Sequence, residues 1–206
     1  KIKIKIKIKM TTINNNQKFL DGNEARNIWA KQIIEQNPLL IDTFNNICGS
    51  VFFKTGQIVL DDSYRQTTIK VIPTNETIWK EKNEKIYIFT RNGDIMKIGG
   101  TRTSMKERFT SYLCGHHVRE RGKSGKMSVT NAYLYHTIEA DLLEKDSIWE
   151  IYSWKLPINQ YTINIFGIDT IITPQTYHAY ESCCINKYKE ITNRLPFLCD
   201  NCDPNY

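Results

Sequence analysis

Four side chains that can act on a phosphate group lie close together in the sequence. Tyr87 and Lys97 are ten positions apart, on either side of Asn92–Gly93, a pair that favours a tight turn between two strands. Arg108 and Tyr112 are four apart and would share one face of a helix. A guanidinium fork binds phosphate oxygens, and a cation beside a phenol lowers a phenol pKa that starts near ~10. These residue types indicate attack on a phosphodiester.

The local sequence predicts the two strands and the helix that would position these four side chains. Ile86–Thr90 and Ile95–Gly99 are short apolar runs, typical of the two strands of a hairpin. The glycines at 99 and 100 are expected to break the second strand. Ser104 is then a suitable N-cap for a helix that ends at Leu113, before Gly115.

The same spacing is compatible with a purely structural interpretation. In that case Tyr87 packs in the core and Lys97 buries its aliphatic stem while its amine stays in water. Arg108 would then pair with Glu107 or Glu120. Spacing alone leaves both interpretations open.

Positive charge is concentrated around these residues. The net charge is +6, but five lysines belong to the alternating Lys/Ile segment 1–9, and without them it would be +1. The basic segment that matters is therefore 91–126, around the four side chains. A cluster of positive charge of this kind attracts polyanions, nucleic acid first, although a solvated charged surface is the alternative. The candidate DNA-binding residues are Arg91, Arg102, Lys106, His116, His117, Arg119, Arg121, Lys123 and Lys126.

Two short motifs resemble the GIY-YIG nuclease family. Lys85-Ile86-Tyr87 and, ten residues later, Lys97-Ile98-Gly99 stand where that family has its two motifs, followed by the helix arginine Arg108. Lysine replaces the first glycine at 85 and the second tyrosine at 97. The lysine at 97 and Tyr112, four residues after Arg108, are similar to the small type II restriction endonucleases of the family. The resemblance spans about residues 85–190.

The resemblance implies a one-metal mechanism on double-stranded DNA. Glu181, in the segment Ala179-Tyr180-Glu181, would hold Mg²⁺ or Mn²⁺. Tyr87 would take or direct the proton of the attacking water with Lys97 beside it, Arg108 would stabilise the phosphoryl oxygens, and Tyr112 would orient the phosphate. His178, one turn before Glu181, is either a neighbour of the metal site or a structural histidine. A palindromic site would further require a homodimer.

Taken along the whole chain, the pattern of expected helices and strands predicts an α+β fold, with a small antiparallel sheet flanked by helices. We divide it into the leader 1–9, an N-terminal α+β appendage at 10–80 that is a possible DNA-recognition element, a catalytic domain at 81–198 with a hairpin insertion, and a tail at 199–206.

The expected elements of the other segments, in chain order, are helices over 24–36 and 37–47, a hairpin over 51–60, strands over 67–72 and 132–138, a helix over 139–147, a strand over 149–154, a hairpin over 161–173 and a helix over 174–195.

Several protein classes are excluded by composition. No apolar run approaches the ~20 residues of a membrane helix, and the Lys/Ile leader is no signal peptide. Six cysteines without a secretion signal fit a reducing compartment, so we expect a cytoplasmic protein. Cys199 and Cys202 have the spacing of half a zinc site, but no second half with zinc-ribbon spacing accompanies them.

We therefore predict a sequence-specific, metal-dependent restriction-type endonuclease. One alternative is a homing or repair-type nuclease of the same family. The other, of a different class, is a basic nucleic-acid-binding protein without catalysis, which the departures at Lys85 and Lys97 allow.

Overall fold

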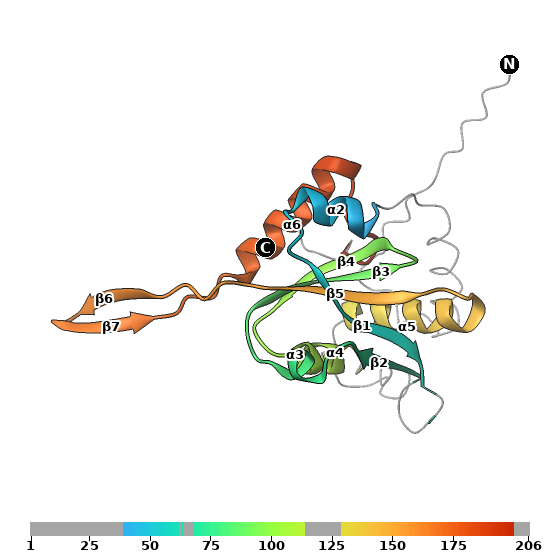
Figure 1. Cartoon of the computed structure of the whole chain (residues 1–206), viewed down its shortest axis with the longest axis horizontal. Helices are drawn as coiled ribbons and strands as arrows, with labels where there is room; N and C mark the ends of the chain where they lie inside the picture. Colours follow the sequence, from blue (N-terminus) through green and yellow to red (C-terminus); the bar gives the residue numbers. More distant parts are fainter. Residues whose placement is uncertain (1–38, 62, 64–67, 114–128, 200–206) are drawn as a thin grey trace, which may run out of the picture.

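A computed structural model describes residues 39–61, 63, 68–113 and 129–199. Its centre is a five-stranded antiparallel sheet in the order β2-β1-β5-β3-β4 (Figure 1). The strands are β1 Phe53–Leu60, β2 Ile69–Pro73, β3 Lys85–Arg91, β4 Asp94–Thr101 and β5 Trp149–Lys155. The α+β class with an antiparallel sheet and flanking helices is confirmed.

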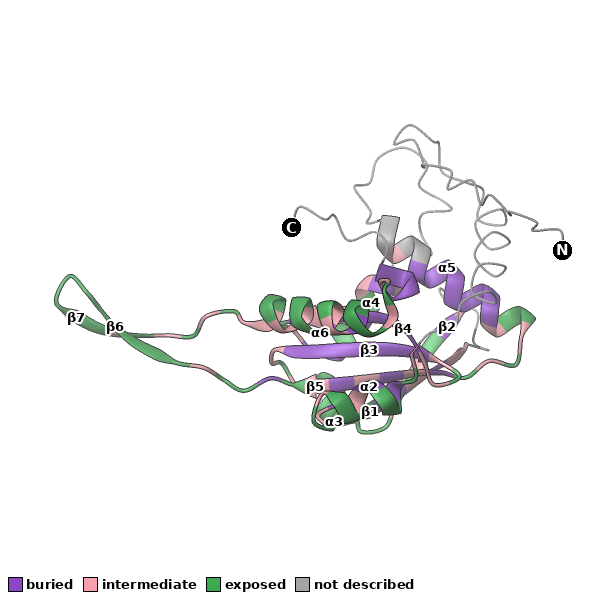
Figure 2. Ribbon diagram, turned by 90° about the horizontal axis from the view of Figure 1, so that it is seen from above, coloured by how far each residue is buried: buried purple, intermediate pink, exposed green. Residues whose placement is uncertain are grey.

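Helices cover both faces of this sheet. One face packs against α3 Glu76–Lys80, α4 Met105–Leu113 and α5 Val129–Glu144, and the other against α2 Ile41–Ile47 and α6 Tyr177–Thr192. Strand β3 separates the two cores, because successive side chains point to opposite faces. Tyr87 and Phe89 enter the core under α4, whereas Ile86 and Ile88 enter the core under α6. Figure 2 shows β3 buried between the layers.

The β3–β4 hairpin forms as the sequence predicts. Asn92 and Gly93 have φ values of 50° and 85°, the left-handed conformation that a two-residue hairpin turn needs. Tyr87 lies opposite Gly99, and Lys97 lies opposite Phe89. The side chains of Tyr87 and Lys97 are therefore diagonal neighbours on one face of the sheet.

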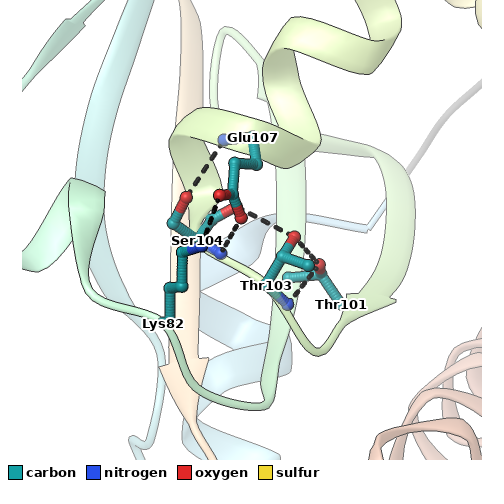
Figure 3. A network of polar contacts seen from close by, with 5 residues as sticks. All are labelled: Lys82, Thr101, Thr103, Ser104 and Glu107. Atoms are coloured by element: carbon teal, nitrogen blue, oxygen red, sulfur yellow. Dashed lines mark hydrogen bonds and ion pairs between the residues drawn. The ribbon is translucent and has the colours of Figure 1, made fainter.

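A capping box begins α4 directly after β4 (Figure 3). The Ser104 hydroxyl accepts a hydrogen bond from the Glu107 backbone N–H at 3.1 Å, and the Glu107 carboxylate accepts one from the Ser104 N–H at 3.3 Å. Glu107 also pairs with Lys82 at 2.9 Å. The helix thus starts at a fixed point next to the edge strand.

The start of α6 is tied to the start of β3. Both oxygens of the Glu84 carboxylate accept hydrogen bonds from the Thr176 backbone N–H, at 2.9 and 3.1 Å, and the Thr176 hydroxyl donates a third at 2.8 Å. A carboxylate is favourable at this end of a helix because the first N–H groups lack partners. This contact fixes where the side chains of α6 meet β4.

The hairpin predicted over 161–173 is confirmed, as β6 Tyr161–Ile165 and β7 Ile168–Ile172. It forms a separate two-stranded sheet that extends away from the body in both views. Among the described residues, no helix is long and apolar enough to cross a membrane.

Three local predictions are wrong. The segment 132–138, expected as a strand, belongs with 139–144 to the single helix α5. The hairpin expected over 51–60 does not form, because β1 is a single strand from Phe53 to Leu60 with a bulge between Lys54 and Gly56. The glycines at 99 and 100 do not break β4, which continues to Thr101.

The division at residue 80 does not coincide with a break in the sheet, since β1 pairs with β5. The strands of the predicted appendage thus extend the same sheet that carries β3 and β4. The predicted helix over 24–36 and the leader 1–9 lie outside the described residues.

Candidate active site

Two phenols and one guanidinium form a closed hydrogen-bonded triangle beneath α4. Arg108 Nε donates to the Tyr87 hydroxyl oxygen at 2.9 Å, and Arg108 Nη2 donates to that of Tyr112, also at 2.9 Å. The two hydroxyl oxygens are 2.5 Å apart and share a hydrogen bond. Both phenol rings are fully buried and stand edge to face. The structure thus brings together three of the predicted catalytic residues, and Arg108 does not pair with Glu107.

Burial sets the protonation state of the triangle. Desolvation raises the pKa of Tyr87 well above its usual value, Tyr112 raises it further, and the opposing effects of Arg108 and Lys97 are smaller. Desolvation likewise raises the pKa of Tyr112. The neighbouring cations do lower the pKa of Tyr87 as expected, but burial and Tyr112 outweigh them, so the pKa is raised overall. Both phenols are neutral at physiological pH.

Lys97 lies beside the triangle, and its amine contacts the backbone near the C-terminal end of the described chain. Its side chain is buried, and its Nζ donates to the Leu198 carbonyl at 3.4 Å. The neighbouring Cys199 thiol bridges the free edge of β4, accepting from the Ile98 N–H at 3.4 Å and donating to the Ile98 carbonyl at 3.2 Å. Cys199 therefore packs against β4, and Cys202 lies outside the described residues.

Glu181 reaches the same place from the other face of the sheet. Desolvation raises the pKa of its half-buried carboxyl, and Lys97, Arg108 and His178 oppose this shift in that order. The Gly100 backbone N–H donates to it. Lys187, a possible partner in solvent, pairs with Glu190 instead at 3.0 Å. Glu181 thus faces the cations of the cluster.

The glycines at 99 and 100 make this approach possible. A Cβ atom at Gly99 would overlap the ring of Tyr87. A Cβ atom at Gly100 would lie 2.5 Å from Cδ2 of Tyr177 and 2.9 Å from Oε2 of Glu181. This role of the pair was not predicted, although a glycine inside a strand is a recognised sign of close approach by a neighbouring group. His178 is exposed, and its ring centroid lies 3.9 Å from that of Tyr177, with the two rings tilted by 33°.

The predicted DNA-binding residues divide into three groups. Arg102 and Lys106 are exposed, beside the start of α4. Arg91 is different, because its Nε donates to the buried Asp141 carboxylate at 2.7 Å, which also accepts from Trp149 Nε1 at 2.8 Å. We therefore assign Arg91 to this internal ion pair and not to DNA. The others, His116, His117, Arg119, Arg121, Lys123 and Lys126, lie outside the described residues.

Among the described residues, the carboxylate of Glu181 faces the cluster as a potential metal ligand. The part of the chain that the structure describes contains no group of three or more His, Cys, Asp or Glu side chains that could hold a metal ion. Mg²⁺ is often held by one or two carboxylates together with water and substrate phosphate. Glu181 fits this requirement because it is an oxygen donor, partly withdrawn from water, whose charge is disfavoured until a cation offsets it.

The fold is similar to that of a solved restriction endonuclease. The structure of restriction endonuclease HPY188I in complex with product DNA superimposes with a TM-score of 0.51, at 21% sequence identity, over 84% of this chain and 91% of that chain. A mutant of bacteriophage T4 EndoII has a TM-score of 0.48 at 19% identity, over 71% and 95% of the two chains. No protein-family model and no curated protein sequence matches this chain.

We predict that Gly100→Ala destabilises the protein by about 1–3 kcal/mol, the usual cost of overpacking a tight contact. The new methyl group would push Tyr177, and with it α6, away from β4. Urea denaturation gives the free energy of unfolding. Adding Tyr177→Ala to Gly100→Ala should cost less than the two single changes together, because the clash is shared. A Gly100→Ala protein as stable as the wild type would contradict the close approach.

A second prediction follows from the pKa of Glu181. A carboxyl whose pKa is higher in the folded than in the unfolded chain opposes folding above its folded pKa, and this penalty disappears below the unfolded pKa. Glu181→Gln should therefore raise the free energy of unfolding by ~1 kcal/mol at pH 8. The gain should vanish near pH 4, where the wild-type carboxyl is protonated.

The same measurement on Glu190→Gln serves as a control, since Glu190 is exposed at the end of the same helix. A Glu181→Gln protein that is less stable than the wild type at pH 8 would show that the carboxylate stabilises the fold.

Proposed function

We propose that this chain is a sequence-specific endonuclease that hydrolyses double-stranded DNA with one divalent metal ion, Mg²⁺ or Mn²⁺, in the manner of a GIY-YIG restriction enzyme. The observation that carries the proposal is the arrangement around β4. Arg108 binds two phenol oxygens on one face, Lys97 lies beside them, and Glu181 faces both cations from the other side. The fold shared with a restriction endonuclease supports it.

Each residue then has a role in phosphodiester hydrolysis. Water attacks phosphorus, the bond to the leaving oxygen breaks, and the water proton must be removed. Tyr87 directs this water, and Arg108 stabilises the charge that develops on the phosphoryl oxygens. One hydroxyl proton lies between Tyr87 and Tyr112, so the other can point to a phosphate oxygen. Tyr112 thereby orients the phosphate.

Because the pKa of Tyr87 is raised, the site needs additional positive charge before Tyr87 can accept a proton. To accept a proton, the phenol must first become a phenolate, which burial opposes. Lys97 already favours the phenolate. A metal ion held by Glu181 would add positive charge nearby, polarise the phosphate and neutralise the leaving oxygen.

DNA contacts and assembly complete the proposal. The exposed Arg102 and Lys106 would bind backbone phosphates next to Arg108, and residues 10–80 remain our proposed recognition element. Cutting both strands at a palindromic site would require a homodimer, because the described residues hold a single Tyr–Arg–Tyr cluster.

The neutral state of Tyr87 also favours a second function, a nucleic-acid-binding protein without catalysis. A homing or repair-type nuclease would share the chemistry and differ in its cleavage pattern.

Incubation with supercoiled plasmid separates the three functions. Metal-dependent loss of the supercoiled form, abolished by EDTA, indicates an enzyme, and discrete fragments indicate restriction-type cutting.

We predict that Lys97→Ala lowers the rate of plasmid cleavage at least ~100-fold, a usual loss for a group that assists proton transfer. DNA affinity, measured by fluorescence anisotropy, should stay nearly unchanged because Lys97 is buried. Lys106→Ala is the control, an exposed cation on α4 whose loss should weaken binding and leave the saturated cleavage rate nearly intact. Wild-type cleavage by Lys97→Ala would refute the assignment.

A further inference from the structure

Next to the catalytic cluster, the outer edge of β4 is closed by side chains. β4 is the last strand of the sheet, and alternate residues of such a strand point their backbone groups outward. At Ile98, the N–H donates to the Cys199 thiol at 3.4 Å, and the thiol donates to the Ile98 carbonyl at 3.2 Å. At Gly100, two residues further on, the N–H donates to the Glu181 carboxylate. A thiol and the proposed metal ligand thus occupy neighbouring positions on the edge of the strand that carries Lys97.

Cys199 takes the place of the neighbour that an edge strand lacks. Its thiol accepts one hydrogen bond and donates another, so it satisfies both outward backbone groups of Ile98. The residue is 1% exposed, and backbone groups buried away from water are costly when they have no partner. An apolar side chain at this position could make neither bond. The thiol therefore fixes its own segment to β4.

The segment that Cys199 fixes also holds Lys97. It is a 3₁₀ turn, η2 Phe197–Cys199, and its Leu198 carbonyl accepts from Lys97 Nζ at 3.4 Å. Lys97 is 6% exposed, and a buried ammonium group needs acceptors in place of the water that it has lost. Leu198 belongs to the same apolar core as Tyr87, so the turn is part of the packing around the catalytic cluster.

We propose that Cys199 is a positioning residue of the catalytic centre, acting through the amine of Lys97. Its thiol anchors the turn on β4, and the Leu198 carbonyl then holds that amine beside Tyr87. The inference rests on the proposed function, because it takes Lys97 to assist Tyr87 in phosphodiester hydrolysis. It assigns Cys199 to the active site, where its sulfur already bonds the backbone of β4, and not to a zinc site.

Chemical labelling of Lys97 tests the anchor without DNA, metal or catalysis. The folded full-length protein is treated briefly with an amine-acylating reagent, and mass spectrometry of its peptides gives the labelling rate at each lysine. In the wild type, Lys97 should react far more slowly than the exposed Lys106, because it is buried and hydrogen-bonded. Cys199→Ala should raise the rate at Lys97 about tenfold or more, since the turn then opens more often. Cys199→Ser keeps one donor and one acceptor and should restore the protection.

Cys184→Ala is the matched control, because Cys184 is a second buried thiol, 6% exposed, in the same apolar core as Cys199. It removes the same atom from that core and leaves the turn on β4 in place, so Lys97 should stay protected. Rapid labelling of Lys97 in the wild type would overturn the proposal without any variant. Equal labelling in Cys199→Ala and the wild type, or in Cys199→Ala and Cys184→Ala, would also overturn it.

Plasmid cleavage gives the second readout. At saturating DNA, Cys199→Ala should cut about tenfold more slowly with unchanged affinity for DNA, and Cys199→Ser should cut nearly as fast as the wild type. Wild-type cleavage by a Cys199→Ala protein whose Lys97 is exposed would overturn the positioning role. A wild type that does not cleave would refute the proposed function, whereas labelling would still show whether the thiol anchors the turn.

Discussion

The architecture of the site depends on the absence of side chains at two consecutive positions of an edge strand. Because Gly99 and Gly100 carry no Cβ, the ring of Tyr87 lies against one face of β4 while Tyr177 and Glu181 lie against the other. The carboxylate of Glu181 on α6 is therefore close enough, across the strand, for Lys97 and Arg108 to lower its pKa. The cap at Ser104 and the contact between Glu84 and Thr176 fix the two helices at this distance.

Electrostatics inside this arrangement are dominated by the loss of water. The pKa values of Tyr87 and Glu181 are both raised, although two cations lie close to them. Desolvation therefore outweighs pairing, and the isolated protein holds the phenol in its neutral form and disfavours the carboxylate charge. A phosphate and a divalent cation would bring the charges that the cluster lacks. Such a site is poised for ligand binding and costs stability without it.

Local spacing predicted the local part of the site. The Asn92–Gly93 turn and the Ser104 cap fixed β3, β4 and α4, and hence Tyr87, Lys97, Arg108 and Tyr112. Local spacing failed for α5, because every residue from Leu134 to Asp141 is buried, so the apolar run there lacks helical periodicity and resembles a strand. The contacts of Glu181 with residues some 80 positions earlier depend on tertiary packing, which spacing cannot supply; only the family resemblance indicated that residue.

We propose that side chains on the two faces of β4 act as one catalytic centre. A double-mutant cycle of Arg108→Lys and Glu181→Gln, measured as single-turnover cleavage of plasmid DNA with Mg²⁺, tests it most directly. One shared centre predicts strong non-additivity, with the double variant about as slow as the slower single variant. Independent, additive losses, or cleavage that neither substitution affects, would contradict the account.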